Sequence, residues 1–320
     1  MKYLVTGGTG FIGSALVRRL VKDGFKVRVI DNDSRGVSKR LEAVAGKIEI
    51  VKADIRDAAA VQKACRGIDS VCHLAYVNGT EFFYSKPDEV LDIAVKGMVN
   101  IINGCIQEKV KEFILASSSE VYQTPPKIPT DETVPLSIPD VMNPRYSYGG
   151  GKIISELMAI NYGRKYFKRV IIFRPHNVYG PDMGYEHVIP QFVLRMKKLC
   201  HEKKGTIRFP IQGTGTETRS FVYIDDFIDG LMLLLKKAKH LNVYHIGTTN
   251  EIPVKHIVKE LGHYFGRNVS IIPSPPTKGA TSRRCPDISK LKKLGYAPKV
   301  TFKEGLCLTA KWYCEKEHSS

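Results

Sequence analysis

A glycine-rich turn near the N-terminus constrains the fold of this chain more than any other feature. Residues 6–14 read TGGTGFIGS, directly after the apolar run Tyr3-Leu4-Val5 and directly before the amphipathic stretch 15–23. A strand, a glycine turn and a helix in this order predict the first βα unit of a dinucleotide-binding fold. Gly7 allows a sharp turn, Gly10 lets the backbone approach a pyrophosphate, and Gly13 lets the helix pack on the strand.

The residues that follow this turn indicate which dinucleotide binds. The predicted helix presents unpaired N–H groups and a positive dipole end to phosphates. Asp31 ends the second predicted strand, where an acidic residue hydrogen-bonds the adenosine ribose 2′-hydroxyl and repels a 2′-phosphate. NAD is therefore expected rather than NADP, although Arg35 lies close enough to accommodate the extra phosphate. Asp54, after the third predicted strand, is expected either at the adenine amine or as a cap of the next helix.

The first half of the chain alternates apolar strands with amphipathic helices. Further strands are expected at 48–51, 70–74, 113–116 and 170–173, and helices at 89–108 and about 148–164. This alternation predicts right-handed βαβ units and an α/β fold, a Rossmann-type doubly wound parallel sheet.

The second half of the chain is punctuated by prolines, which predicts short elements in a smaller C-terminal substrate-binding lobe. We expect residues 1–176 to form the NAD-binding domain and residues 177–320 to form mainly the substrate lobe. A helical pattern at 221–237 and an apolar strand at 243–246 predict that about 220–248 rejoins the main sheet.

Composition narrows the functional classes. The chain has 320 residues, of which 43% are hydrophobic, with 49 Lys+Arg against 32 Asp+Glu and a net charge of +17. The basic residues are spread along the chain without interleaved aromatics, so we expect a lysine-rich surface and small anionic substrates rather than nucleic acid. Apolar stretches are shorter than the roughly 20 residues of a membrane span. The seven cysteines are scattered without C-x-x-C spacing, which predicts no metal site and a cytoplasmic protein.

Two residues further along the chain suggest proton transfer. Tyr148 and Lys152 stand at i and i+4 on a predicted helix, so they share one face. A lysine about 4 Å from the phenol is worth roughly 4 kcal/mol at an effective dielectric constant of ~20, enough to favour phenolate near neutral pH. Residues 117–119, three serines, close an apolar strand at the sheet edge where ligands bind.

Together these segments resemble the extended short-chain dehydrogenase/reductase family, in particular its NAD-dependent nucleotide-sugar epimerases, dehydratases and decarboxylases. The resemblance covers essentially the whole chain. The matching segments are TGGTGFIGS at 6–14, HLA at 73–75, SSSEVY at 117–122, YGGGK at 148–152, RPHNVYGP at 174–181 and TRSFVYIDD at 218–226.

The resemblance implies a role for each matching residue. Ser118 hydrogen-bonds the reacting sugar oxygen, Tyr148 is the base, and Lys152 also holds the nicotinamide ribose. Asn177 and Arg219 contact the substrate diphosphate, as the planar fork of arginine suits phosphate, and Ser119 also faces the substrate. The expected cofactor-binding residues are Gly7, Gly10, Phe11, Ile12, Gly13, Asp31, Asp54, Ile55, Leu74, Ala75, Tyr148, Lys152 and Pro175.

The implied reaction is oxidation of a nucleotide-diphosphate sugar at C4, followed by return of the hydride to the opposite face, a 4-epimerisation. The alternative is a 4,6-dehydratase or a decarboxylase that uses Glu120. Because Ser118, Tyr148 and Lys152 are all present, a non-enzymatic NAD-binding protein is disfavoured. Similar proteins usually form a homodimer through their two long central helices.

Several positions depart from the family pattern. Ser119 stands where dehydratases usually carry aspartate, and His187 stands where an arginine of the decarboxylases is expected. Ala94 replaces a frequent asparagine. Tyr76 replaces the frequent small residue after HLA. These departures leave the exact reaction open.

Overall fold

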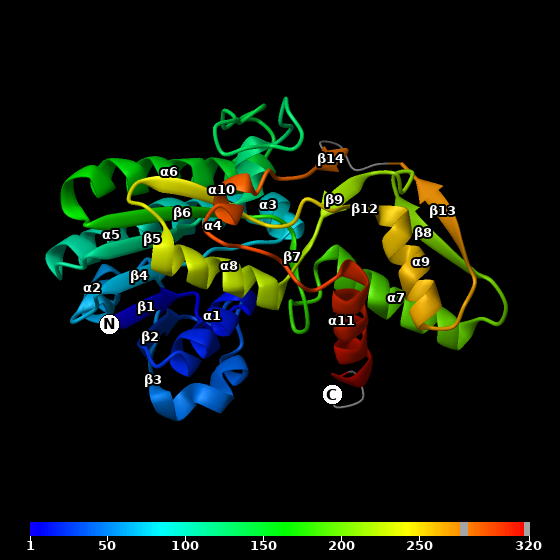
Figure 1. The fold of residues 1–320 in the computed structure, drawn as a ribbon, viewed down its shortest axis with the longest axis horizontal. Helices are drawn as coiled ribbons and strands as arrows, with labels where there is room; N and C mark the ends of the chain where they lie inside the picture. The colour runs from blue at the N-terminus through cyan, green and yellow to red at the C-terminus, as the bar shows by residue number, and fades with distance from the viewer. Residues whose placement is uncertain (276–280, 317–320) are drawn as a thin grey trace.

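The computed structural model describes residues 1–275 and 281–316, and its centre is one parallel sheet (Figure 1). The seven strands follow the order β11-β6-β5-β4-β1-β2-β3, and every neighbouring pair is parallel. Strand order reverses between β1 and β4, so the carboxyl ends of these strands open a crevice there. The predicted doubly wound sheet is confirmed. Its strands are β1 (Lys2–Thr6), β2 (Lys26–Asp31), β3 (Ile48–Lys52), β4 (Ser70–His73), β5 (Glu112–Ala116), β6 (Arg169–Pro175) and β11 (Asn242–Ile246).

Helices cover both faces of this sheet because its side chains alternate between two apolar cores. On one face, Val5 belongs to a core with residues of α1 (Phe11–Lys22) and α8 (Ile224–Lys237). On the other face, Leu4 belongs to a core with residues of α2 (Ala58–Cys65), α5 (Met98–Gln107) and α6 (Tyr146–Tyr166). Both faces of every central strand are therefore buried, as expected of a parallel sheet.

The second half of the chain both rejoins the sheet and builds a smaller lobe beside it. The helix α8 packs on the sheet, and β11 pairs in parallel with β6. The lobe on the right of Figure 1 consists of α7 (Val188–Glu202), α9 (Val254–Tyr264), α11 (Phe302–Lys316) and the parallel strands β8 (Ile207–Gln212) and β13 (Val269–Ser274).

Short strands connect the lobe to the sheet. A parallel pair joins β7 (Val178–Tyr179) to β10 (Val222–Tyr223), and β9 (Thr218–Ser220) lies between β12 (Glu251–Pro253) and β14 (Arg283–Arg284). The other short elements are α3 (Thr80–Ser85), α10 (Ser289–Lys292), η1 (Ser38–Lys47) and η3 (Ser119–Tyr122).

The helix expected at 89–108 is present but is not uniform. It consists of α4 (Pro87–Asp92), a π-helical turn η2 (Ile93–Gly97) and α5. The helix expected at about 148–164 spans 146–166. Among the described residues, no helix is both long enough and apolar enough to cross a membrane.

Candidate active site

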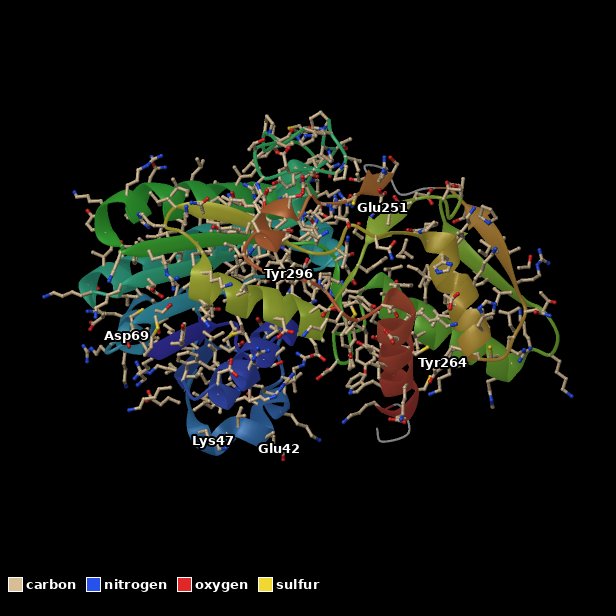
Figure 2. All side chains as sticks on the ribbon, in the orientation of Figure 1. Glu42, Lys47, Asp69, Glu251, Tyr264 and Tyr296 are labelled. Atoms are coloured by element: carbon tan, nitrogen blue, oxygen red, sulfur yellow. The ribbon has the colours of Figure 1, made fainter. Side chains whose placement is uncertain are left out.

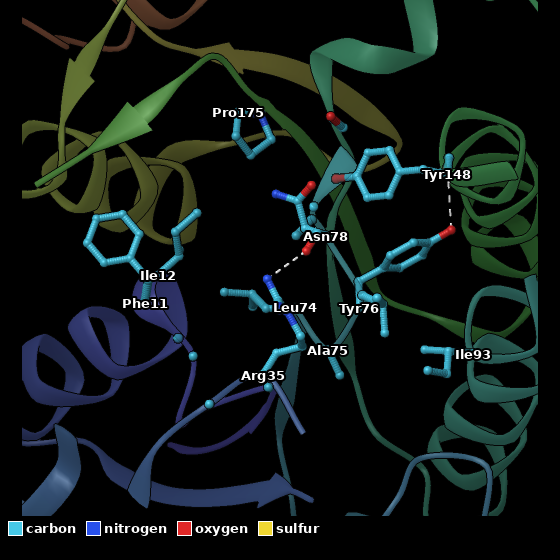
Figure 3. A pocket seen from close by; sticks show the side chains of 18 of the residues that line it. Phe11, Ile12, Arg35, Leu74, Ala75, Tyr76, Asn78, Ile93, Tyr148 and Pro175 are labelled. Carbon is cyan, nitrogen blue, oxygen red and sulfur yellow. Dashed lines mark hydrogen bonds between the residues drawn. The ribbon is translucent and has the colours of Figure 1, made fainter. Parts of the chain in front are cut away.

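A cleft with a cavity volume of about 490 Å³ lies at the carboxyl edge of the sheet (Figure 3). Its walls come from the glycine turn, from the ends of β2, β4, β5 and β6, from α6 and from the start of the second lobe. Every residue expected to bind the cofactor lines it, together with Ser118, Ser119, Glu120 and Asn177. Arg219 is the one expected site residue that does not line the cleft.

The glycine turn has no room for side chains where it meets the sheet. Gly7 has φ +70°, and a Cβ there would lie 2.7 Å from the backbone nitrogen of Ala75. A Cβ on Gly13 would lie 2.0 Å from the carbonyl oxygen of Gly7. Among the described residues, no side chain caps the start of α1 and no acidic residue occupies its first turn. The exposed N–H groups of this turn therefore fit the pyrophosphate of a dinucleotide.

Asp31 is held in a fixed orientation at the end of β2. Its two carboxylate oxygens accept hydrogen bonds from the backbone N–H groups of Thr9 and Asp33, both at 2.9 Å. An ionised carboxylate has further lone pairs for a ribose hydroxyl. The guanidinium of Arg35 points elsewhere: it donates to the carboxylate of Glu186 and, at 2.9 Å, to the carbonyl oxygen of Asn78 (Figure 3). Because Glu186 neutralises Arg35, the ambiguity left by the sequence resolves in favour of NAD.

Asp54 does not cap the helix that follows it, which was one of the two roles expected from the sequence. Its carboxylate accepts hydrogen bonds from Nε and Nη2 of Arg56 at 3.0 and 2.7 Å, and also from Asn32. These bonds from Arg56 lower the pKa of Asp54. The side chain of Asp57 caps α2 by accepting the N–H of Ala60. The expectation that Asp54 caps this helix is therefore wrong, while its place in the cleft is compatible with a contact to adenine.

The phenol and ammonium expected to act together both enter the cleft from α6, but they are not in close contact. Nζ of Lys152 lies 5.8 Å from the ring centroid of Tyr148 and donates a 2.7 Å hydrogen bond to the carbonyl oxygen of Ala116. Burial lowers the pKa of Lys152 to about 7, an effect that Glu156 partly opposes. The groups that shift the pKa of the Tyr148 phenol are its burial, Ser118 and Glu120, rather than Lys152 as the sequence predicted.

Burial has the largest influence on the phenol of Tyr148, and it favours the neutral form. Burial raises its pKa to about 12, while a hydrogen bond with Ser118 acts in the opposite direction and the charge of Glu120 adds to the rise. The expectation of a phenolate near neutral pH, sustained by Lys152, is not met. Ser118 is instead the side chain that favours the phenolate form.

Glu120 forms an ion pair with Arg284, a residue that the sequence analysis missed. The side chain of Arg284 is 8% exposed and that of Glu120 27% exposed. Burial acts to raise the pKa of Glu120, but the charge and hydrogen bond of Arg284 outweigh it, so the pKa is lowered. The only signal in the sequence was a pair of adjacent arginines, which cannot show that one of them reaches the cleft from β14.

Arg219 lies beside this ion pair, outside the cleft lining. It is paired with Arg284 in the register of β9 and β14, and its guanidinium donates to the carbonyl oxygens of Thr218 and Thr281 at 2.7 and 2.6 Å. Burial, followed by repulsion from Arg284, lowers its pKa to about 10. Among the described residues, no group of three or more His, Cys, Asp or Glu side chains is arranged to hold a metal ion.

The chain as a whole is similar to known proteins. The sequence model described as "NAD dependent epimerase/dehydratase family" matches residues 3–247. The chain belongs to this family. It is therefore an NAD-dependent enzyme, as the sequence predicted, and the glycine turn and Asp31 are the features of the cleft that fit this cofactor.

Relatives within the epimerase/dehydratase family catalyse different reactions. A UDP-N-acetyl-alpha-D-glucosaminuronate decarboxylase from Bacillus cytotoxicus is 29% identical, with 98% of each chain covered. A UDP-glucose 4-epimerase from Thermotoga maritima, solved with UDP-glucose, is 28% identical with a TM-score of 0.88 over 99% of this chain and 100% of that one. A dTDP-glucose 4,6-dehydratase from Streptomyces venezuelae, solved with NAD, is 30% identical. Its TM-score is 0.88, with 100% of this chain and 98% of that chain covered.

The position of Asp31 predicts the cofactor preference. We expect the protein to bind NAD more tightly than NADP in calorimetry, because the carboxylate repels a 2′-phosphate. Asp31→Ala should weaken NAD binding by roughly tenfold or more, because it removes a hydrogen bond to a charged group. The difference between the affinities for NAD and NADP should become smaller. Asp23→Ala, which changes an exposed aspartate at the other end of α1, is the control. Equal affinities of the unaltered protein for NAD and NADP would contradict the assignment.

Proposed function

We propose that this enzyme oxidises a nucleotide-diphosphate sugar at C4 and then returns the hydride to the opposite face of the sugar, a 4-epimerisation. The supporting observation is that Ser118, Tyr148 and Lys152 line the same cleft as the glycine turn and Asp31. A group that transfers a proton therefore lies in the same cavity as a site that fits a hydride carrier. NAD, when bound, accepts the hydride and supplies a positive charge that lowers the pKa of a nearby phenol.

Each of the three side chains has a distinct task in this proposal. Tyr148 takes the proton of the sugar hydroxyl as general base. Ser118 hydrogen-bonds both the phenol and the reacting sugar oxygen, which holds the two groups in line. Lys152 is fixed by the carbonyl oxygen of Ala116, which takes one of the three N–H donors of the ammonium and orients the others.

The second lobe supplies the contacts to the substrate. Asn177 lines the cleft, and its amide donates to the carbonyl oxygen of Ser220 at 3.0 Å, so its side chain is oriented by β9. Arg219 and Arg284 lie side by side on β9 and β14. We propose that Asn177 and these two arginines bind the diphosphate, for which guanidinium groups are well suited. Similarity to proteins that act on UDP- and dTDP-sugars supports this class of substrate.

The state of Glu120 favours epimerisation over dehydration. Its lowered pKa and its ion pair with Arg284 make it a weak base for removing a C5 proton. Ser119, in place of an aspartate, provides no acid for a departing C6 hydroxyl. Epimerisation requires neither group, because only C4 changes.

A dehydratase or decarboxylase remains the second candidate, and one observation favours it. Glu120 lines the cleft immediately after Ser118, in a position to meet the sugar, and its partner Arg284 lines the cleft as well. A base beside C5 serves dehydration, and an arginine at the same place can bind a C6 carboxylate that is to be lost.

The first test of the proposal concerns Tyr148. The enzyme is incubated with a panel of UDP-, GDP-, dTDP- and CDP-sugars, and the products are read by NMR. With the substrate so identified, Tyr148→Phe should lower turnover by about 10²- to 10⁴-fold, the usual contribution of a general base. NAD binding should change little, because the phenol oxygen transfers a proton and does not anchor the cofactor. Tyr264→Phe, at an exposed tyrosine on α9 in the second lobe, is the control. Retention of most turnover in Tyr148→Phe would remove this residue from the mechanism.

The second test separates the two candidate reactions through Glu120. In an epimerase, Glu120→Gln should cost about tenfold or less, about 1.4 kcal/mol, because no proton moves through this side chain. In a dehydratase, the same change should stop product formation while reduced cofactor accumulates from the first oxidation. Glu251→Gln is a matched control, since Glu251, which is labelled in Figure 2, pairs with Arg283 and does not line the cleft. Deuterium from D₂O at C5, with a 4-keto-6-deoxy product, would refute the epimerase proposal.

We also propose that two copies of the chain associate through α4, α5 and α6. The outer surface of these helices exposes apolar side chains, namely Leu91, Val99, Ile154, Leu157, Tyr162 and Tyr166. An exposed apolar surface of this kind is typical of an interface, and a twofold axis lets the same patch cover itself.

Light scattering should therefore show a dimer. Leu157→Arg, at a side chain that is 59% exposed, should shift the mass to that of a monomer because it places a charge in the interface. Leu308→Arg on α11, where the side chain is 50% exposed, should leave the dimer intact. A monomer in the unaltered protein would rule out this interface.

A further inference from the structure

Tyr76, the residue that departs from the family pattern after HLA, reaches into the catalytic part of the cleft. It follows β4, and the face of its ring lies beneath Lys152, with 3.8 Å between Nζ and the ring centroid. The ring also meets that of Tyr148 edge-on, at 5.1 Å between centroids. Its hydroxyl donates a long hydrogen bond of 3.4 Å to the backbone carbonyl oxygen of Tyr148 (Figure 3). Tyr76 therefore contacts both residues of the proposed proton-transfer pair.

Space for this ring comes from a glycine in the middle of α6. A Cβ on Gly151 would lie 2.1 Å from the hydroxyl oxygen of Tyr76 and 2.6 Å from Cβ of Ala94, which belongs to the π-helical turn. Glycine is unfavourable inside a helix. Gly151, just before Lys152, therefore lowers the stability of the α6 helix. The Tyr76 hydroxyl occupies the space that a side chain at this position would need.

The charges around Lys152 leave its buried ammonium poorly compensated. On its own helix it faces the neutral phenol of Tyr148 and the carboxylate of Glu156, but Arg174 already binds that carboxylate with hydrogen bonds of 2.8 and 2.6 Å. On β4 it faces His73, which burial and the charge of Lys152 keep neutral by lowering its pKa to about 3.

Two further elements pack against the ammonium. The end of β5 contributes the carbonyl oxygen of Ala116, and the segment after β4 contributes the ring of Tyr76. Tyr76 is itself neutral, because burial and the nearby Tyr148 raise its pKa. A cation is attracted more strongly to an aromatic face when it is removed from water, and Lys152 is only 4% exposed.

We propose that Tyr76 is a positioning residue, whose ring holds the Lys152 ammonium in place and keeps it charged although Lys152 is almost fully buried. What the positioned ammonium does for the substrate rests on the proposed function, but the interaction between the two residues does not. The attraction between cation and ring should therefore be measurable in the protein without any substrate.

The test follows the protonation of Lys152 by NMR in protein with ¹³C-labelled lysine. The Cε signal of Lys152 is assigned by its loss in Lys152→Arg, and its shift is recorded against pH. In the unaltered protein we expect a midpoint of about 7. Tyr76→Leu keeps an apolar side chain but removes the ring, so the midpoint should fall by about one pH unit. Tyr76→Phe keeps the ring and should restore the midpoint to within about 0.3 units of the original.

A graded series makes the test independent of folding defects. Phenylalanines with one, two and three ring fluorines at position 76 keep the shape of the ring while withdrawing electrons from its face. The Lys152 midpoint should fall stepwise along this series if the ring stabilises the cation. Tyr264→Leu, on α9 in the second lobe, is the control and should leave the midpoint unchanged (Figure 2).

The possible outcomes separate this inference from the proposed function. A midpoint that is constant across the fluorinated series, or that rises in Tyr76→Leu, would overturn the role of Tyr76 even if the enzyme oxidises a nucleotide sugar. A stepwise fall would support it even if the substrate panel gave no product. With a substrate in hand, the loss of kcat/KM at high pH should begin about one pH unit lower in Tyr76→Leu than in Tyr76→Phe.

Discussion

The contact between Gly13 and Gly7 is the constraint on which the cleft depends. A Cβ on Gly13 would lie 2.0 Å from the carbonyl oxygen of Gly7, so α1 can start against the end of β1 only because Gly13 lacks a side chain. This close packing places the first turn of α1 at the point where strand order reverses. Gly7 in turn lets the segment after β4 approach, since a Cβ there would overlap the backbone nitrogen of Ala75. This part of the cleft is thus lined by backbone, which is what a phosphate-binding turn requires.

A buried ion pair fixes the catalytic side of the cleft against this floor. Glu156 on α6 and Arg174 on β6 have side chains that are 7% and 4% exposed, and Ser117 at the end of β5 donates to the same carboxylate. Removing one partner of such a pair typically costs about 3–5 kcal/mol, because the other charge is left buried and unpaired. Glu156 stands one helical turn after Lys152, and Ser117 stands next to Ser118. The ion pair therefore sets the spacing between the residues proposed to transfer the proton.

The sequence predicted those parts of the structure that depend on local pattern. The glycine turn, the alternation of strands and helices, and the Tyr148 to Lys152 spacing each lie within one short segment, and the structure shows the corresponding elements. The contacts that were missed or mistaken join distant segments. Arg284 reaches Glu120 from β14, and Lys152 turns toward Tyr76 and Ala116 rather than toward Tyr148. Helical spacing puts two residues on one face but does not say which neighbour attracts a long side chain once tertiary contacts form.

The central claim is that the substrate is oxidised at C4 and reduced again within one cleft. The most direct measurement mixes the NAD-loaded enzyme with the accepted nucleotide sugar carrying deuterium at C4, and records both the absorbance of reduced nicotinamide and the position of deuterium in the product. The account predicts that reduced cofactor appears more slowly than with hydrogen at C4, and that deuterium returns to the sugar without loss to water. Turnover with neither an isotope effect nor reduced cofactor, or with deuterium washed out at C4, would contradict it.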